Sequence, residues 1–170
     1  MPDVQITAPD GVPQVVVTTE LDAPRTLVYR AHVEPGLLST WLGPRRLTTE
    51  VERFEVRDGG RWRLVQRDDA GHEYGFHGVF HGAPTPDSTV RTFEFEGAPG
   101  HVSLEELELE ELDDTTYLRT VSVFHSVRDR DIMLRSGMEQ GIRESYERLE
   151  ELLAHLKTSN HDELEEEEAA

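Results

Sequence analysis

The stretch that decides the fold is residues 130–156, which read RDIMLRSGMEQGIRESYERLEELLAHL. Apolar and small side chains recur in it at a spacing of three or four, at Leu134, Met138, Ile142, Ser145, Leu149, Leu152 and Leu156. This spacing predicts an amphipathic helix of about 27 residues and about 40 Å. Because a helix with one apolar stripe must bury it, the rest of the chain must supply a large apolar face.

The segments before this helix predict that face. Turn signals at 58–60, 68–71, 83–87, 97–100 and 113–114 separate short segments with the composition of β-strands. The predicted strands are 47–56, 61–66, 73–80, 89–95, 102–112 and 116–124, and residues 14–21 add a seventh. Connections of hairpin length between them indicate an antiparallel meander. Two short helices are predicted between the first strand and Gly43-Pro44, one opened by Asp22 and Pro24.

Alternation along these strands assigns their buried faces. Aromatic and apolar side chains share one face of each strand, namely Trp62 and Leu64, Tyr74, Phe76 and Phe80, Phe93 and Phe95, and Leu118 to Phe124 at every second residue. In 102–112, Leu104 is out of phase with Leu107 and Leu109, which predicts a β-bulge. The acidic cluster Glu105, Glu106, Glu108, Glu110 and Glu111 predicts a solvated strand edge.

Composition and charge exclude several classes of protein. The 170 residues carry a net charge of −18, which disfavours nucleic acid and anionic membranes as partners. The absence of Cys excludes disulfides and thiolate metal sites. With no apolar run long enough to span a bilayer and no signal peptide, we expect a cytoplasmic protein. We predict a flexible lead-in at 1–13, one domain at 14–157 and a disordered acidic tail at 158–170.

An ordered set of short motifs resembles a known family. They are DAPR at 22–25, WLGP at 41–44, GGRWR at 59–63, YGFHG at 74–78, TFEFEG at 92–97, and GM, G and SYERL within 137–149. Together they resemble the activator of heat-shock-protein-90 ATPase C-terminal-like family of the START-like (SRPBCC) superfamily. The similarity covers about residues 14–156. It implies an α+β, helix-grip (Bet v-like) fold, in which a curved antiparallel sheet wraps the long C-terminal helix around a cavity.

The resemblance and the apolar pattern together predict a ligand site between sheet and helix. Gly137 and Gly141 lie four apart on the predicted helix, and they either leave open volume or let the sheet approach closely. Candidate ligand-binding residues are Trp41, Trp62, Tyr74, Phe76, Phe93, Phe95, Ser122, Phe124, Met133, Gly137, Met138 and Gly141. Each also has a plainer role as core, and Trp41 as an anchor between the short helices.

Metal and catalytic sites are not predicted. His77 and His81 are about 13 Å apart on a strand, too far to share an ion, and we expect both to face solvent. The chain lacks the motifs of serine hydrolases, nucleotide-binding loops and zinc peptidases. His101 and His125 stand near strand ends and could act as acid or base, although surface positions are the simpler interpretation.

Three functions follow in order of preference. The first is binding of a small hydrophobic or aromatic molecule, lipid or polyketide-like, without catalysis and with a role in sequestration or antibiotic self-resistance. The second is a polyketide cyclase or dehydratase, and the third is a co-chaperone that stimulates a heat-shock-protein ATPase. The superfamily includes proteins with each of these three functions, so the fold alone does not distinguish between them. No cofactor is expected, and we expect a monomer or a homodimer.

Overall fold

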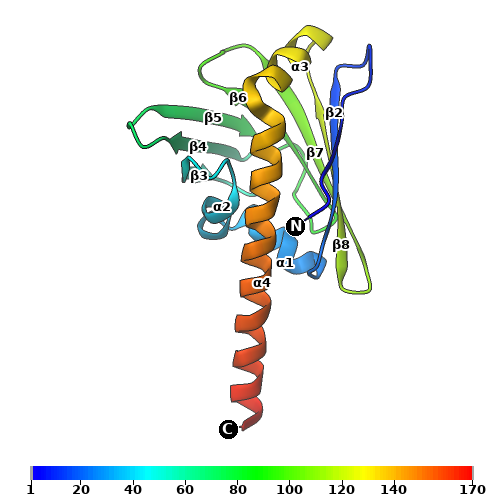
Figure 1. Cartoon of the computed structure of the whole chain (residues 1–170), viewed down its shortest axis with the longest axis vertical. Helices are drawn as coiled ribbons and strands as arrows, with labels where there is room; N and C mark the ends of the chain where they lie inside the picture. Colours follow the sequence, from blue (N-terminus) through cyan, green and yellow to red (C-terminus); the bar gives the residue numbers. More distant parts are fainter. Residues whose placement is uncertain (1, 170) are drawn as a thin grey trace.

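An antiparallel sheet curves around the first part of a long C-terminal helix in the computed structural model, which describes residues 2–169 and the side chains of residues 2–161 (Figure 1). Across these residues the sheet has eight strands, in the order β1-β2-β8-β7-β6-β5-β4-β3. They are β1 Gln5–Thr7, β2 Gln14–Leu21, β3 Thr48–Phe54, β4 Arg61–Arg67, β5 Glu73–Val79, β6 Ser88–Phe95, β7 Val102–Leu112 and β8 Thr115–Val123. The helix-grip architecture and the seven predicted strands are confirmed.

The eighth strand lies in the segment predicted as a flexible lead-in. Residues Gln5–Thr7 pair with β2, so the prediction of a loose segment is wrong there. Side chains from the C-terminal region hold this segment in place. The buried guanidinium of Arg130 donates from Nη1 to the carbonyls of Pro9 and Val12, each at 2.5 Å, and Arg143 donates to Val4 O. A three-residue strand is too short to show alternation, and these contacts are distant in sequence.

The predicted single helix at 130–156 is divided in two. Helix α3 spans Val127–Met133, a π-helical turn η1 spans Leu134–Met138, and α4 spans Glu139–Ala169. Ser126 caps α3 by accepting a hydrogen bond from Asp129 N at 3.0 Å. The interruption occurs at Gly137, whose φ of 92° is left-handed and therefore suits glycine. The apolar spacing continues across the break, which is why the pattern does not reveal it.

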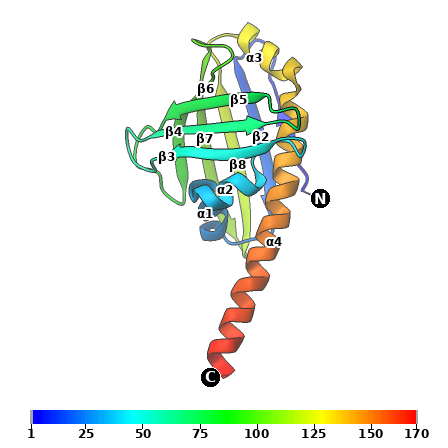
Figure 2. The ribbon, with the colours of Figure 1, turned by 90° about the vertical axis from the view of Figure 1, so that its left-hand side faces the viewer.

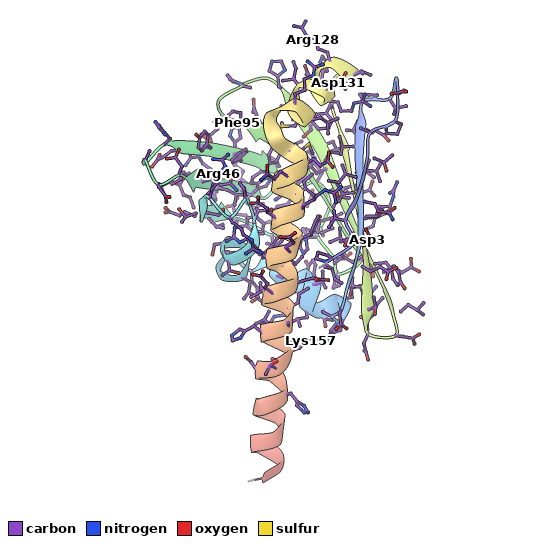
Figure 3. All side chains as sticks on the ribbon, in the orientation of Figure 1. Asp3, Arg46, Phe95, Arg128, Asp131 and Lys157 are labelled. Atoms are coloured by element: carbon purple, nitrogen blue, oxygen red, sulfur yellow. The ribbon has the colours of Figure 1, made fainter. Side chains whose placement is uncertain are left out.

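Helix α4 continues past the sheet, as Figures 1 and 2 show. Its first half crosses the concave face, where Leu149 and Leu153 are buried, and Lys157 (labelled in Figure 3) donates to Asp22 O at 2.9 Å. Residues 158–169 belong to this helix, so the prediction of a disordered tail is wrong for their backbone. The side chains of residues 162–169 lie outside the described residues, as does residue 170. In the part of the chain that is described, no helix is long and apolar enough to cross a membrane.

The two short helices, α1 Arg25–Val33 and α2 Pro35–Trp41, lie beside α4 at the end of the sheet opposite α3 (Figure 2). Their buried residues Val28 and Leu38 join a core that also contains Trp62 of β4 and Leu149 of α4. Several members of this core, among them Leu38, Phe80 and Tyr146, also line the cavity described below.

Strand β7 keeps a regular alternation. It pairs with β6 and β8 without a register shift, so the predicted bulge is wrong. Ser103, Leu107 and Leu109 are buried on the inner face, while Leu104 is 43% exposed on the outer face. The predicted solvated edge is also wrong, because β7 pairs with both β6 and β8 and is an interior strand. Glu106, Glu108, Glu110 and Glu111 are exposed, whereas Glu105 is partly buried and shares the inner face.

Candidate functional site

A cavity of about 320 Å³ lies between the concave face of the sheet and the helices. Its walls are mainly apolar and come from every layer of the fold, with Phe54, Phe76, Phe80, Phe93 and Phe124 from the sheet side, Leu38 and Leu42 from α2 and the residue after it, and Met133, Met138 and Ile142 from α3, η1 and α4. Such a lining is typical of sites for small apolar molecules.

The structure brings seven of the predicted site residues onto this wall. They are Phe76, Phe93, Ser122, Phe124, Met133, Met138 and Gly141. They come from strands β5, β6 and β8, from the residue that follows β8, and from the helical segments that cross the sheet. Their role in ligand binding stays a prediction, but their common location is a property of the fold.

Four other predicted site residues lie behind the wall or next to it. Trp41 is buried, donates from Nε1 to Ala31 O at 2.9 Å and stacks on Tyr146, so it fixes α2 against α1 and α4. Trp62 is buried beneath Arg91, and Phe95 contacts Phe76 with ring centroids 5.2 Å apart. Tyr74 pairs with Gln66 across β4 and β5 and is half-buried.

The two glycines of the helical segment have different roles. A Cβ built on Gly141 meets nothing within 4 Å, and Gly141 lines the cavity. Of the two interpretations of this residue, open volume is therefore the one that the structure supports. Gly137 provides the left-handed turn between α3 and α4 and is not on the cavity wall.

An ion pair lies on the mainly apolar wall. Arg91 and Glu105 are directly opposite each other on β6 and β7, and Nε of Arg91 donates to Oε2 of Glu105 at 3.1 Å. The guanidinium carbon lies 4.4 Å from the ring centroid of Trp62, a cation–π arrangement that fixes the plane of the group. Ser122 is opposite Glu105 on β8 and extends this polar row across three strands.

Two further polar side chains adjoin the ion pair. Tyr146 of α4 lines the cavity, and burial raises the pKa of its phenol, with a smaller contribution from the charge of Glu105. A hydrogen bond links Tyr146 with Thr120 on β8. The phenol is therefore neutral at physiological pH, and it gives the cavity wall a group that can form hydrogen bonds.

His32 of α1 is the remaining titratable group on the wall. Its Nδ1–H donates to Val28 O at 2.8 Å, and its ring meets Trp41 edge-on with centroids 4.9 Å apart. The pKa of His32 is lowered from 6.5 to about 4, chiefly by burial and to a smaller extent by the positive charge of Arg91, against the opposing effect of the Val28 hydrogen bond. The imidazole is neutral at pH 7, with an unprotonated Nε2.

This shift predicts a pH-dependent stability. The unfolded chain binds a proton at His32 below pH 6.5 and the folded chain does not until about pH 4. The contribution of His32 to the free energy of unfolding should therefore be fully present above pH 7. It should fall by about 2 kcal/mol between pH 7 and pH 5. Urea denaturation of wild type and of His32→Gln isolates this contribution, because other groups titrate in both proteins. A difference between the two proteins that stays constant with pH would contradict the assignment.

Sequence analysis missed Arg91, Glu105, His32 and Tyr146. Arg91 has the same strand parity as Phe93 and Phe95, and Tyr146 follows Ile142 by four residues on the helix. These spacings indicate that the side chains of Arg91 and Tyr146 face inward. Glu105 was hidden by the wrong parity of β7. His32 carried no signal, since its position depends on how α1 meets the sheet.

The remaining histidines with a proposed role lie away from the cavity wall. His77 is half-exposed and faces Glu94 at 3.1 Å and Glu96 at 3.4 Å, and His101 faces Asp129 at 3.1 Å. Neither of them, nor His125, lines the cavity. Among the residues with described side chains there is no group of three His, Asp or Glu placed to hold a metal ion.

Comparison with known proteins gives one family and a set of solved structures. A family model described as Activator of Hsp90 ATPase homolog 1-like protein matches residues 22–154. No curated protein matches the chain in sequence. A crystal structure of a Rhodobacter sphaeroides protein has a TM-score of 0.82 at 25% identity and covers 90% of this chain and 99% of its own.

Two further structures show the same fold. A solution structure from Arthrobacter aurescens has a TM-score of 0.82 at 24% identity, covering 89% of this chain and 91% of its own. A crystal structure of protein Ms6760 from Mycobacterium smegmatis has a TM-score of 0.80 at 21% identity, covering 88% of this chain and 96% of its own. At these sequence identities the structural similarity shows a common fold and says nothing about function.

Proposed function

The chain belongs to the family of Activator of Hsp90 ATPase homolog 1-like proteins, and from this premise we propose that it binds a small hydrophobic or aromatic molecule in the cavity between sheet and helix. The observation that carries the proposal is the open, mainly apolar volume of about 320 Å³ beside Gly141. Well-packed proteins of this size have few voids larger than a water molecule. An unfilled cavity of this volume costs packing contacts and so lowers stability, whereas a bound ligand would restore those contacts.

Binding of naphthalene tests this proposal, because its two rings fit the volume and it carries no polar group. We expect saturable binding with one site per chain, and an affinity in the micromolar range from burial of the aromatic surface. Amide chemical shifts recorded during titration should change for Phe93, Gly141 and Met138 and stay constant for residues of β1. Unchanged shifts at saturating naphthalene would reject the proposal.

Within this proposal the protein acts by holding its ligand. A protein that sequesters a polyketide-like compound in the cytoplasm, as in antibiotic self-resistance, needs a closed apolar site and no reaction chemistry. An aromatic polyketide should then compete with naphthalene and be recovered unchanged after incubation. Neither a nucleic acid nor a membrane is part of the proposed function, in keeping with the net charge of −18.

A second candidate is a cyclase or dehydratase, favoured by the unprotonated His32 and the Arg91–Glu105 pair on the cavity wall. A neutral imidazole beside bound substrate can accept a proton, and an arginine can stabilise developing negative charge on oxygen. Product analysis by liquid chromatography separates the candidates, since an enzyme converts a linear poly-β-ketone while a binding protein returns it unchanged. The His32→Gln variant should retain binding under both candidates and lose conversion under the second.

A further inference from the structure

Arg91 and Glu105 form an ion pair on the cavity wall, and the geometry of this pair constrains what can bind there. The ion pair uses Nε of the guanidinium and Oε2 of the carboxylate. Among the described residues no hydrogen bond is recorded for the terminal nitrogens Nη1 and Nη2 or for Oε1. Both side chains are partly exposed, at 20% and 27%, as are Phe76, Phe93 and Met138 on the same wall. The terminal nitrogens of Arg91, which can donate hydrogen bonds, and Oε1 of Glu105, which can accept one, therefore border the same space.

The charges on this wall are balanced. Arg91 contributes one positive charge and Glu105 one negative charge, while His32 and Tyr146 are neutral at pH 7. Glu106 also borders the cavity, but its position in the alternation of β7 places its exposed side chain on the outer face of the sheet. An anionic ligand would lose its hydration and gain no uncompensated positive charge in return, and a cation would meet the same difficulty.

We propose that the ligand is a neutral aromatic molecule with a hydroxyl group that lies between Arg91 and Glu105. The ligand oxygen accepts a hydrogen bond from a terminal nitrogen of Arg91, and the ligand O–H donates to Oε1 of Glu105. One hydroxyl satisfies both partners because it is a donor and an acceptor at once. Its aromatic body then lies along Phe93, Phe76 and the open space beside Gly141. This inference rests on the proposed binding function and names the chemical class of its ligand.

A series of four naphthalenes tests the inference on the wild-type protein, with affinities measured by calorimetry. The series is naphthalene, 2-methoxynaphthalene, 2-naphthol and 2-naphthoate, which carry no polar group, an acceptor, a donor with an acceptor, and an anion. We expect 2-naphthol to bind about tenfold more tightly than 2-methoxynaphthalene, as a hydrogen bond to a charged partner contributes about 1.5 kcal/mol. We expect 2-naphthoate to bind at least about tenfold more weakly than 2-naphthol, because its charge is desolvated without compensation.

The outcomes of this series are distinct. Equal affinities for naphthalene, its methoxy derivative and 2-naphthol would overturn the inference and leave the proposed function standing. Tightest binding of 2-naphthoate would also overturn it. No binding of any of the four compounds would overturn the proposed function itself, and this inference with it.

The variant Glu105→Gln provides an independent measurement, because it keeps the size of the side chain and removes its charge. Arg91 is then uncompensated, so we expect the preference to invert, with 2-naphthoate gaining about tenfold and 2-naphthol losing about tenfold. Glu110→Gln is the matched control, because Glu110 is on the same strand with its exposed side chain on the outer face. An unchanged preference in a folded Glu105→Gln protein would overturn the inference, and if this variant does not fold, the wild-type series decides.

Discussion

Replacement of Gly141 by Leu should abolish binding of naphthalene while leaving the free protein at least as stable as wild type. The added side chain projects into the cavity, since a Cβ at Gly141 meets no atom within 4 Å. A ligand forced against it faces an overpacking cost of about 3 kcal/mol, equivalent to about a hundredfold loss of affinity. Leu is also a better helix former than Gly, which favours the folded state by up to about 1 kcal/mol.

Calorimetry and urea denaturation together check this expectation. Gln140→Leu is the matched control, because it adds the same side chain to the preceding residue of α4 on the exposed side of the helix. The control should bind naphthalene as wild type does. The cavity assignment would be refuted by a Gly141→Leu protein that is clearly destabilised, which would indicate tight core at this position. Full binding by that variant would refute it equally.

Replacement of Gly78 by Ala should have the largest effect on stability. Gly78 faces Trp62 on the neighbouring strand β4, and a Cβ at this position would lie 1.8 Å from the carbonyl oxygen of Thr92 and 2.7 Å from Nε1 of Trp62. Neither neighbour can move easily, because one is backbone of β6 and the other is a fully buried indole. We expect a loss of at least about 3 kcal/mol in the free energy of unfolding.

Denaturation followed by tryptophan fluorescence and circular dichroism measures this loss. Gly36→Ala is the appropriate control, because a Cβ there meets nothing within 4 Å in helix α2. That variant should be as stable as wild type or slightly more so. Equal stability of the two alanine variants would show that the sheet does not approach Gly78 as closely as described.

Local patterns in the sequence were sufficient for most of the sheet. Each predicted strand lies within a few residues of an observed one, because turns rich in Gly, Pro and Asp separate them clearly. The error in β7 arose from treating every Leu as buried. Leu104 is 43% exposed, and a single exposed Leu is ordinary in a folded protein. Had its position been taken as outward, the alternation would have placed Glu105 on the inner face opposite Arg91.

The site could be predicted only in part, because some of its residues meet through contacts that are distant in sequence. Phe76, Phe93 and Phe124 were found because apolar alternation predicts an inner face. His32 reaches the cavity because α1 packs near Arg91, and no spacing in the sequence encodes that approach. The break at Gly137 was missed for a different reason. An apolar spacing of four is compatible with both a continuous helix and one interrupted by a π-turn.

The contacts of Arg130 determine where this chain can be shortened. Its side chain is 5% exposed, and it donates to the carbonyls of Pro9 and Val12. A truncated protein that starts at Gln14 would keep the guanidinium and lose both acceptors, leaving the buried charge with Asp131 as its remaining recorded partner. The segment that contains Pro9 and Val12 is therefore part of the packing around α3, and shortened variants should retain it.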